Sequence, residues 1–206
     1  MTAQLPARIV YLDLDDVLAD FRTAACNLIG ADPEETNRLC REKNEWDISK
    51  AHGIPSHVLW TKIAEKGEAF WTSLSLLGHA TELIELVAKT NCLFQTGRSE
   101  LANKSKHVYV LSSPGIDPEG TATVGKLLWL KRNFGKGYTN GIITPHKELL
   151  ARPGSILIDD KPENCERWEQ AGGSSILFPG PVANNQYVGK ELQFVRAEIM
   201  RHILGE

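Results

Sequence analysis

The stretch RIVYLDLDDVLADF, residues 8–21, decides the fold, because it joins a short apolar run to a dense group of acidic residues. The run from Arg8 to Asp13 is apolar without alternation, which is typical of a strand buried on both faces of a parallel sheet. Asp15 and Asp16 follow at once, and three carboxylates within four positions repel one another unless a cation lies between them. Mg²⁺ is a hard cation that prefers such oxygen ligands. A lone acidic pair here would more simply favour the dipole of a following helix.

Three further runs are similarly brief and rich in Val, Ile and Leu, and each ends in polar or turn residues. They are residues 108–112, 155–159 and 174–178. Helical patterns lie between and after the runs, at residues 80–89, 124–134, 163–171 and 192–204. Strands that alternate with helices predict an α/β fold with a doubly wound parallel sheet. In such a sheet, ligands bind beyond the carboxyl ends of the strands.

The segment 24–77 interrupts this alternation directly after the first strand, and its pattern is mostly helical. Its large aromatic residues are Trp46, Trp60, Phe70 and Trp71. We expect residues 1–23 and 78–206 to form the core domain, and residues 24–77 to form a small helical cap inserted over the strand ends. Buried aromatic residues in a small helical unit are more often core than ligand contacts, so each one alone is interpreted as core.

A second acidic group ends the run at 155–159. The sequence LIDDK, residues 157–161, is again a buried strand that finishes in paired carboxylates, Asp159 and Asp160. Two parallel strands that both end in adjacent acids can converge on one metal ion. The candidate Mg²⁺ ligands are Asp13, Asp15, Asp159 and Asp160.

These motifs resemble those of a known superfamily. DLDDVLADF, residues 13–21, looks like the first motif of haloacid-dehalogenase (HAD) superfamily phosphatases, and LIDDK looks like the fourth. The resemblance narrows to the 5'(3')-deoxyribonucleotidase family, which combines a DxDGVLADF opening, a helical cap and a late LIDDK. VYVLSSP resembles that family's second motif, and GKLLWLKRNFG resembles the helix that carries its third-motif lysine. In this order, the motifs extend the resemblance from about Arg8 to Asn185.

The resemblance implies a role for each acidic residue. Asp13 would be the nucleophile that forms an aspartyl-phosphate, and the metal would offset its repulsion from the phosphate. Asp15 would protonate the leaving oxygen and then activate water, with its backbone carbonyl also facing the metal. Of the last pair, Asp160 is expected to contact Mg²⁺ directly, and Asp159 is expected to stand behind it.

The resemblance also implies phosphate and substrate contacts. Ser112 and Ser113 would donate hydrogen bonds to phosphate oxygens, and Lys126 would spread positive charge over them. Lys147 resembles another phosphate-side lysine, although a solvated loop lysine is nearly as good an explanation. A surface lysine is also the ordinary expectation for Lys126 outside the family context. The aromatic residues that match a substrate pocket are Phe21, Phe70 and Trp71, and core packing is the competing explanation for them.

Two features depart from the family pattern. Asp16 stands where the family usually has glycine, so this carboxylate would either perturb the acid/base pKa or the turn, or point outward at a helix start. Residues 91–107 form a longer connection than expected, and within it CLFQTGRS resembles the second motif of another HAD branch. In that reading Thr96 would contact the phosphate in place of Ser112. We prefer Ser112, because VYVLSSP is the more convincing strand, and we interpret the TGR segment as an insertion without an assigned role.

Composition limits the partners to expect. The formal net charge of −3 and the lack of a basic stripe argue against stable nucleic-acid or membrane binding. The four cysteines are scattered without metal-finger spacing, so no zinc site is expected. The first residues lack a signal-peptide pattern and no apolar stretch has the length of a bilayer span, which favours a cytoplasmic location. A homodimer is compatible with the sequence.

The leading hypothesis is magnesium-dependent hydrolysis of a (deoxy)nucleoside monophosphate to nucleoside and phosphate. A 3'-phosphatase acting on nucleic-acid ends would use the same acidic motif, but the mild acidity argues against it. Another small-molecule HAD phosphatase stays open, because cap residues set selectivity. A non-catalytic HAD-like binding protein is disfavoured because Asp13 and Asp15 are both present. A dehalogenase is disfavoured because its reaction has no role for a second acid such as Asp15.

Overall fold

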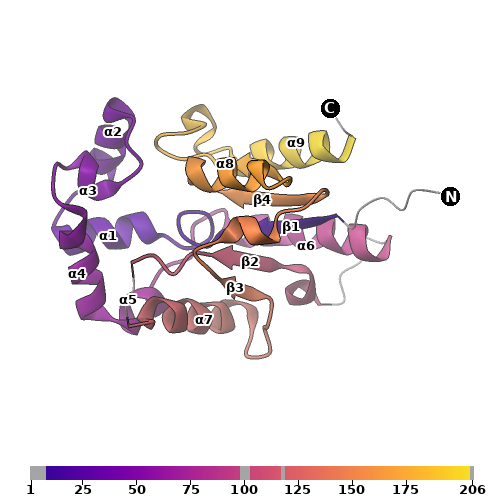
Figure 1. Cartoon of the computed structure of the whole chain (residues 1–206), viewed down its shortest axis with the longest axis horizontal. Coiled ribbons are helices and arrows are strands. Elements are labelled where there is room, and N and C mark those ends of the chain that lie inside the picture. The colour runs from indigo at the N-terminus through magenta and orange to yellow at the C-terminus, as the bar shows by residue number, and fades with distance from the viewer. Residues whose placement is uncertain (1–7, 98–102, 117–118, 205–206) are drawn as a thin grey trace.

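The computed structural model describes residues 8–97, 103–116 and 119–204, and a parallel sheet lies at its centre (Figure 1). The strand order is β3-β2-β1-β4-β5. The strands are β1 (Ile9–Leu12), β2 (Tyr109–Ser112), β3 (Gly141–Ile143), β4 (Ser155–Asp159) and β5 (Ser174–Leu177). The predicted doubly wound parallel α/β fold is therefore confirmed. β3 was not predicted from the sequence, and it adds an edge strand beside β2.

The register of the central strands brings the acidic motifs together. In β1, Leu12 pairs with Val110 of β2 on one side and with Ile158 of β4 on the other. The backbone N–H of Asp13 then donates to the carbonyl of Ile158 at 2.8 Å. Because β1 and β4 run parallel and end at the same level, Asp13 and Asp159 leave the sheet at the same edge.

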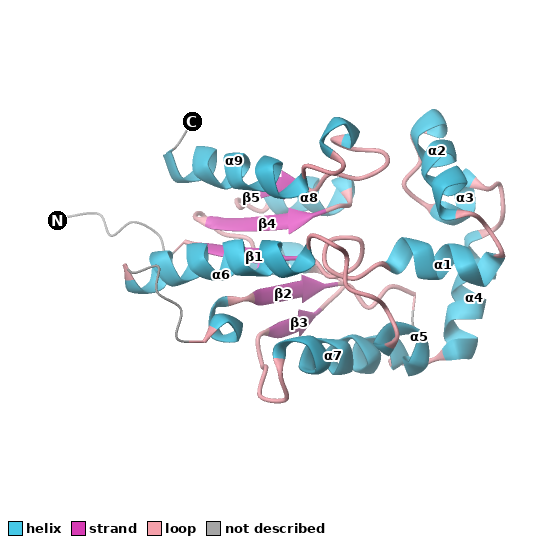
Figure 2. Cartoon of the chain, turned by 180° about the vertical axis from the view of Figure 1, so that it is seen from behind, coloured by secondary structure: helices cyan, strands magenta, loops and turns pink. Residues whose placement is uncertain are grey.

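Helices cover both faces of the sheet (Figures 1 and 2). Alternate strand residues point to opposite faces, so Val10 and Leu12 join one apolar cluster while Tyr11 joins another. The first cluster includes residues of α6 (Ala80–Thr96), α7 (Thr121–Phe134) and α9 (Glu191–Leu204), and the second includes Trp168 of α8 (Pro162–Gln170). Among the described residues, we find no helix that combines the length and the apolar character needed to span a membrane.

The helical insertion follows β1, as predicted. Its helices are α1 (Phe21–Ile29), α2 (Pro33–Lys43), α3 (Ile48–Ala51), α4 (Ser56–Lys66) and α5 (Glu68–Thr72). Figure 1 shows α2, α3 and α4 standing beyond the carboxyl ends of the strands, with α5 beside α7. A Cβ atom at Gly125 of α7 would lie 2.6 Å from Cβ of Trp71, so glycine allows α5 and α7 to approach closely. The division of the chain at residues 24 and 77 stays a prediction.

The two chain segments that join the cap to the core run side by side. Ala19 and Leu76 form an antiparallel bridge. The N–H of Asp20 donates to the carbonyl of Ser75 at 2.9 Å, and the N–H of Leu77 donates to that of Leu18 at 3.0 Å. The cap therefore leaves and rejoins the core at one place, a few residues beyond Asp15.

The first part of the segment 91–107, residues 91–96, is not the insertion that the sequence suggested. Asn91 to Thr96 continue α6, and the buried amide of Asn91 donates to the carbonyls of Val10 and His107, each at 2.9 Å, which attaches α6 to the sheet. The alternative in which Thr96 ends a strand and binds phosphate is wrong, because Thr96 is helical and its hydroxyl donates to the carbonyl of Cys92. Arg98 and Ser99 of that motif lie outside the described residues.

Candidate active site

The structure brings the two acidic motifs into one buried group. Asp13 follows β1, Asp159 ends β4, and Asp160 comes next in the chain. One carboxylate oxygen of each of the three lies within 4.8 Å of the others, and all three side chains are buried. Such a group is stable only when cations or hydrogen-bond donors balance the charges.

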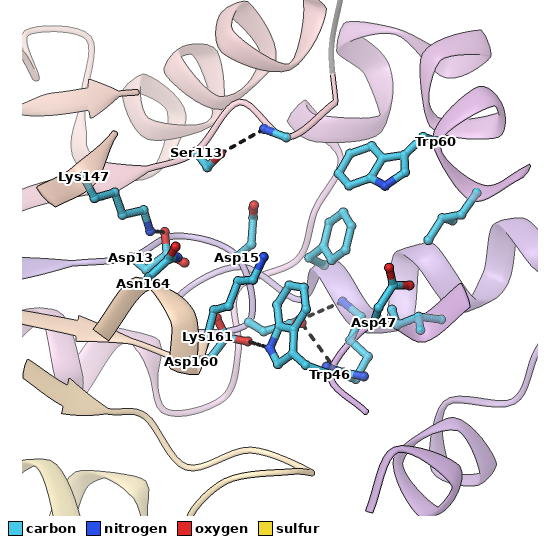
Figure 3. Close-up of a pocket in the computed structure, with 16 residues that line it drawn as sticks. Asp13, Asp15, Trp46, Asp47, Trp60, Ser113, Lys147, Asp160, Lys161 and Asn164 are labelled. Carbon is cyan, nitrogen blue, oxygen red and sulfur yellow. Dashed lines mark hydrogen bonds and ion pairs between the residues drawn. The ribbon is translucent and has the colours of Figure 1, made fainter. Parts of the chain in front are cut away.

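Lys147 balances two of these carboxylates. Its Nζ lies 2.6 Å from Asp13 Oδ1 and 2.6 Å from Asp159 Oδ2, and the Asp13 contact is visible in Figure 3. Burial opposes the charge on this lysine, but the neighbouring Asp13 and Asp159 raise the pKa of Lys147 above its ordinary value. The side chain is only 4% exposed, so Lys147 is a buried residue of the site and not a solvated loop lysine.

Asp159 and Asp160 differ in their hydrogen bonds. Besides Lys147, Asp159 accepts from the amide of Asn164 at 3.0 and 3.1 Å and from the N–H of Lys161 at 3.0 Å. Asp160 accepts from the indole Nε1 of Trp46 at 2.9 Å, through Oδ2. Burial raises the pKa of both carboxyls, and the neighbouring acids raise it further. Protein donors thus occupy both oxygens of Asp159, whereas no described residue donates to Asp160 Oδ1.

A second lysine occupies the other side of the acidic group. Lys126 Nζ donates to Asp15 Oδ2 at 2.5 Å, to Ser112 Oγ at 3.1 Å and to the carbonyl of Ser113 at 2.5 Å. It also lies 4.5 Å from the centre of the Trp71 ring. Burial raises the pKa of Asp15, Lys126 lowers it, and Asp13 raises it again.

Helical spacing explains why Lys126 points inward. Ala122, Trp129 and Leu130 of α7 are buried, and Lys126 stands on the same face four residues from the first and last of them. The side chain is 1% exposed, so the ordinary expectation of a surface lysine does not hold. Helix α7 therefore places a buried positive charge at the strand ends.

Asp16 adopts a backbone conformation that explains the usual glycine of the family. Its φ angle is +55°, in the left-handed region, which glycine occupies readily and aspartate tolerates. Its carboxylate accepts from the N–H of Arg22 at 2.7 Å and lies 3.6 Å from Arg22 Nε. Burial raises the pKa of Asp16 to about 6 although Arg22 opposes the shift. The alternative in which Asp16 points outward is therefore wrong, because its carboxylate pairs with the buried Arg22. Asp16 anchors the first cap helix.

A cavity of about 160 Å³ extends from the acidic group into the cap (Figure 3). Its core side includes Asp13, Asp15, Ser113, Lys147 and Asp160, and its cap side includes Phe21, Trp46, Ile48, Leu59 and Trp60. Figure 3 shows Trp46 and Trp60 on the cap side, facing the acids and lysines of the core. The site thus joins a charged floor to an apolar, aromatic wall.

The aromatic residues divide differently from the sequence interpretation. Phe21 lines the cavity, whereas Phe70 and Trp71 pack behind it and are not among the lining residues. The Phe21 and Trp71 rings stack at 5.7 Å with an interplanar angle of 15°. Trp46 and Trp60, interpreted as core from the sequence, lie on the cavity wall. Asn164, which holds Asp159, was also missed, although its place in the first turn after LIDDK was a possible signal.

The residues present fit a divalent cation. When all five carboxylates are ionised, they exceed the three buried cations by two charges; the acids are Asp13, Asp15, Asp16, Asp159 and Asp160, and the cations are Arg22, Lys126 and Lys147. Asp15 Oδ1 is buried without a hydrogen-bond partner among the described residues. All of the available donors are oxygen atoms, as Mg²⁺ prefers. Asp13, Asp159 and Asp160, whose carboxylate oxygens lie within 4.8 Å of one another, could therefore hold it.

The parallel sheet, the helical insertion after β1 and the buried acids at the strand ends define a HAD-like hydrolase. The model of the family described as "5' nucleotidase, deoxy (Pyrimidine), cytosolic type C protein" matches residues 7–197. The chain therefore belongs to that family, as the sequence resemblance predicted. It is 27% identical over 157 residues to a protein of Vibrio phage KVP40 named "Putative 5'(3')-deoxyribonucleotidase", which covers 76% of this chain and 68% of the phage protein.

The chain is also similar to solved structures, at low sequence identity and low TM-scores. A hydrolase from Streptococcus pneumoniae TIGR4 is 15% identical, with a TM-score of 0.46, and the match covers 90% of this chain and 100% of that one. The HAD family enzyme BT-2542 from Bacteroides thetaiotaomicron, solved with magnesium and inorganic phosphate, is 17% identical with a TM-score of 0.38, covering 84% and 94%. These similarities concern the fold alone.

Proposed function

We propose that this protein is a magnesium-dependent phosphomonoesterase that converts (deoxy)nucleoside monophosphates to nucleoside and phosphate. The observation that carries the proposal is the single cavity in which Asp13, Asp15 and Lys147 lie opposite Phe21, Trp46 and Trp60. The phosphate would bind at the charged side of this cavity, and the nucleoside would pack against the aromatic side. Membership of the deoxyribonucleotidase family supports the same substrate class.

The proposed reaction has two displacement steps. In the first, an oxygen of Asp13 bonds to phosphorus as the bond from phosphorus to the nucleoside oxygen breaks, and Asp15 gives that oxygen a proton. In the second, Asp15 takes a proton from water, whose oxygen attacks the aspartyl-phosphate and releases phosphate and free Asp13. The elevated pKa of Asp15 suits a carboxyl group that must hold a proton before the first step. Bound Mg²⁺ would reduce the charge repulsion between Asp13 and the phosphate.

Polar groups around Asp13 would hold the phosphate. Lys126 and Lys147 supply buried positive charge on two sides of the acids. Ser113 lines the cavity, and its Oγ accepts from the N–H of Gly115 at 3.2 Å, which leaves the hydroxyl proton for a phosphate oxygen. Ser112 is fully buried beneath Lys126 and would act by orienting that lysine.

The cap would bind the nucleoside and would have to move to admit it. The cavity of about 160 Å³ is smaller than the roughly 300–1,000 Å³ usual for small-molecule sites. Trp60 also approaches the β2–α7 connection closely, since a Cβ atom at Gly115 would lie 2.6 Å from its ring. We therefore propose that the structure represents the closed position of the cap, and that outward movement opens the path for a mononucleotide. All four cysteines are buried and none forms a disulfide, which supports the proposed cytoplasmic location.

A panel of phosphate monoesters, assayed with Mg²⁺ and with EDTA, tests this function. We expect phosphate release from dUMP and dTMP only with Mg²⁺, and no release by Asp13→Asn. The panel should also contain a nucleoside 3'-monophosphate, an oligonucleotide 3'-phosphate and a sugar phosphate. Preference for the oligonucleotide would replace the proposal with a nucleic-acid-end phosphatase. Preference for the sugar phosphate would replace it with a different small-molecule phosphatase.

A further inference from the structure

A hydrogen bond connects the cap directly to the acidic group. Trp46 lies between α2 and α3, and its indole Nε1 donates to Asp160 Oδ2 at 2.9 Å, across 114 positions of the chain (Figure 3). Asp160 is 8% exposed. Among the described residues, the Trp46 indole is the only hydrogen-bond donor to its carboxylate. The orientation of Asp160 therefore depends on a residue of the cap.

The surroundings of Trp46 hold the indole in this place. Asp47, the next residue, accepts from the N–H groups of Ser49 and Lys50 and from the hydroxyl of Ser56, which fixes the backbone at the start of α3. On the core side, Lys161 Nζ lies 4.9 Å from the centre of the Trp46 ring. A cation over an indole face is attractive. The hydrogen bond is thus supported from both domains.

The contrast with Asp159 indicates what the bond does. Asp159 is held through both oxygens by Lys147, Asn164 and a backbone N–H, so its carboxylate cannot rotate freely. Asp160 is held through Oδ2, and no described residue donates a hydrogen bond to its Oδ1. A carboxylate fixed through one oxygen presents the other in a defined direction, as is usual for residues that support metal ligands.

We infer that Trp46 is a positioning residue for the cation site, and that it links cation binding to the position of the cap. This inference rests on the proposed metal site. Outward movement of the cap breaks the bond from Trp46 and releases Asp160, so cation affinity falls as the cap opens. Because such coupling is reciprocal, a bound cation also favours the closed cap.

Calorimetric titration of the whole protein with Mg²⁺, without nucleotide, tests the inference. Trp46→Phe keeps an aromatic ring on the cavity wall and removes the N–H donor. We expect it to weaken the Mg²⁺ Kd by about 10-fold or more, as for other residues that support metal ligands. Trp60→Phe is the matched control, because Trp60 lines the same cavity without a described hydrogen bond to a carboxylate, and its Kd should stay within about twofold of the parent value. An unchanged Kd in Trp46→Phe would overturn the inference.

Kinetics separate positioning from stacking. A positioning role predicts that the Trp46→Phe defect shrinks as Mg²⁺ is raised to saturation. A role in stacking alone predicts a higher KM for the nucleotide at every Mg²⁺ concentration, and this result would contradict the inference. If the parent protein binds Mg²⁺ and Trp46→Phe weakens it, the inference stands even when no nucleotide is hydrolysed. In that case the result would contradict only the proposed nucleotide substrate.

A measurement on the parent protein removes the dependence on a folded variant. The assigned indole N–H resonance of Trp46 should shift during a Mg²⁺ titration, with a midpoint equal to the calorimetric Kd. The resonance of Trp168, which belongs to the other apolar cluster, should not move. A Trp46 indole N–H resonance that does not shift when Mg²⁺ is added would overturn the inference.

Discussion

The ammonium group of Lys126 lies 2.5 Å from the carboxylate of Asp15, although 111 positions separate the two residues in the chain. The same nitrogen contacts Ser112 and Ser113, so it joins the end of β2 to the residues that follow β1. Burial raises the pKa of Asp15 and Lys126 lowers it, so the lysine limits how strongly the carboxyl holds its proton. The position of α7 thus affects two properties of the proposed site: the positive charge available to a phosphate and the proton affinity of Asp15.

Replacement of Lys126 tests this relationship. We expect Lys126→Met to lower kcat/KM for dUMP by about 10²–10³-fold, because a buried donor to the transferring phosphoryl group is lost. Since Lys126 lowers the pKa of Asp15, its removal should also move the pH–rate profile to higher pH. Lys131→Met is the control, because Lys131 is exposed on the same helix. An unchanged rate with an unchanged pH profile would remove Lys126 from the site.

The proposed proton transfer by Asp15 predicts a dependence on the leaving group. Asp15→Asn should slow hydrolysis of dUMP by about 10²–10⁴-fold, the range for loss of a general acid or base. With p-nitrophenyl phosphate, whose leaving group needs no proton, the first step should be nearly spared while the second is slow. A stopped-flow burst of p-nitrophenolate is therefore expected. Equal losses in both steps for both substrates would contradict the assignment.

The buried pair of Asp16 and Arg22 should contribute to stability. Asp16→Gly relieves a left-handed conformation that costs about 1–2 kcal/mol, but it leaves the Arg22 guanidinium without its carboxylate, which costs about 3–5 kcal/mol. We expect the free energy of unfolding in urea to fall by about 1–4 kcal/mol. The double variant with Arg22→Met should recover most of the loss. A variant as stable as the parent would show that the pair is not needed.

The crowded carboxylates predict an unusual dependence of stability on pH. The pKa of Asp16 is raised from 3.8 to about 6 in the folded state, and those of Asp159 and Asp160 are also raised. A raised carboxyl pKa means that the folded state holds the proton more tightly than the unfolded state. In EDTA, the stability of the protein should therefore fall as pH rises from about 4 through 6.

Calorimetric Tm measurements between about pH 4 and 8 provide the check. Mg²⁺ should raise the Tm most at the upper end of this range, where the acids are ionised and their repulsion is largest. The Asp160→Asn variant, with one ionisable group fewer, should show a shallower fall in EDTA. A metal-free Tm that rises steadily with pH would contradict the assigned pKa directions.

The sequence predicted those parts of the site that depend on local pattern. An apolar run followed by Asp13, and another followed by Asp159 and Asp160, had to place their acids at one edge once the strands were parallel. Lys126 was predictable from its place in the helix only with the family motif in view, because helical spacing alone does not exclude a surface lysine. The family membership itself was likewise predictable from the order of the motifs.

Other features depend on tertiary packing, which local pattern does not encode. β3 is three residues long and gains its identity by pairing with β2. Trp46 lies in a short connection, so no periodicity indicated that its indole would reach Asp160. Residues 91–96 were assigned to a long connection after the predicted helix at 80–89, whereas the helix continues to Thr96. Tertiary packing also decides that Phe21 lies on the cavity wall and Trp71 behind it. The sequence does not distinguish the two residues, because both are aromatic.

The paired crossings of the cap, at Ala19 and Leu76, have a consequence for how such an enzyme can diversify. Both ends of the cap meet the core at one point. The cap is therefore attached to the sheet at a single place and does not constrain the strands at two separate positions. A cap of different length or shape could be grafted there without altering the strand order. New substrates are therefore accessible through exchange of the cap, while the acids at the strand ends keep their arrangement.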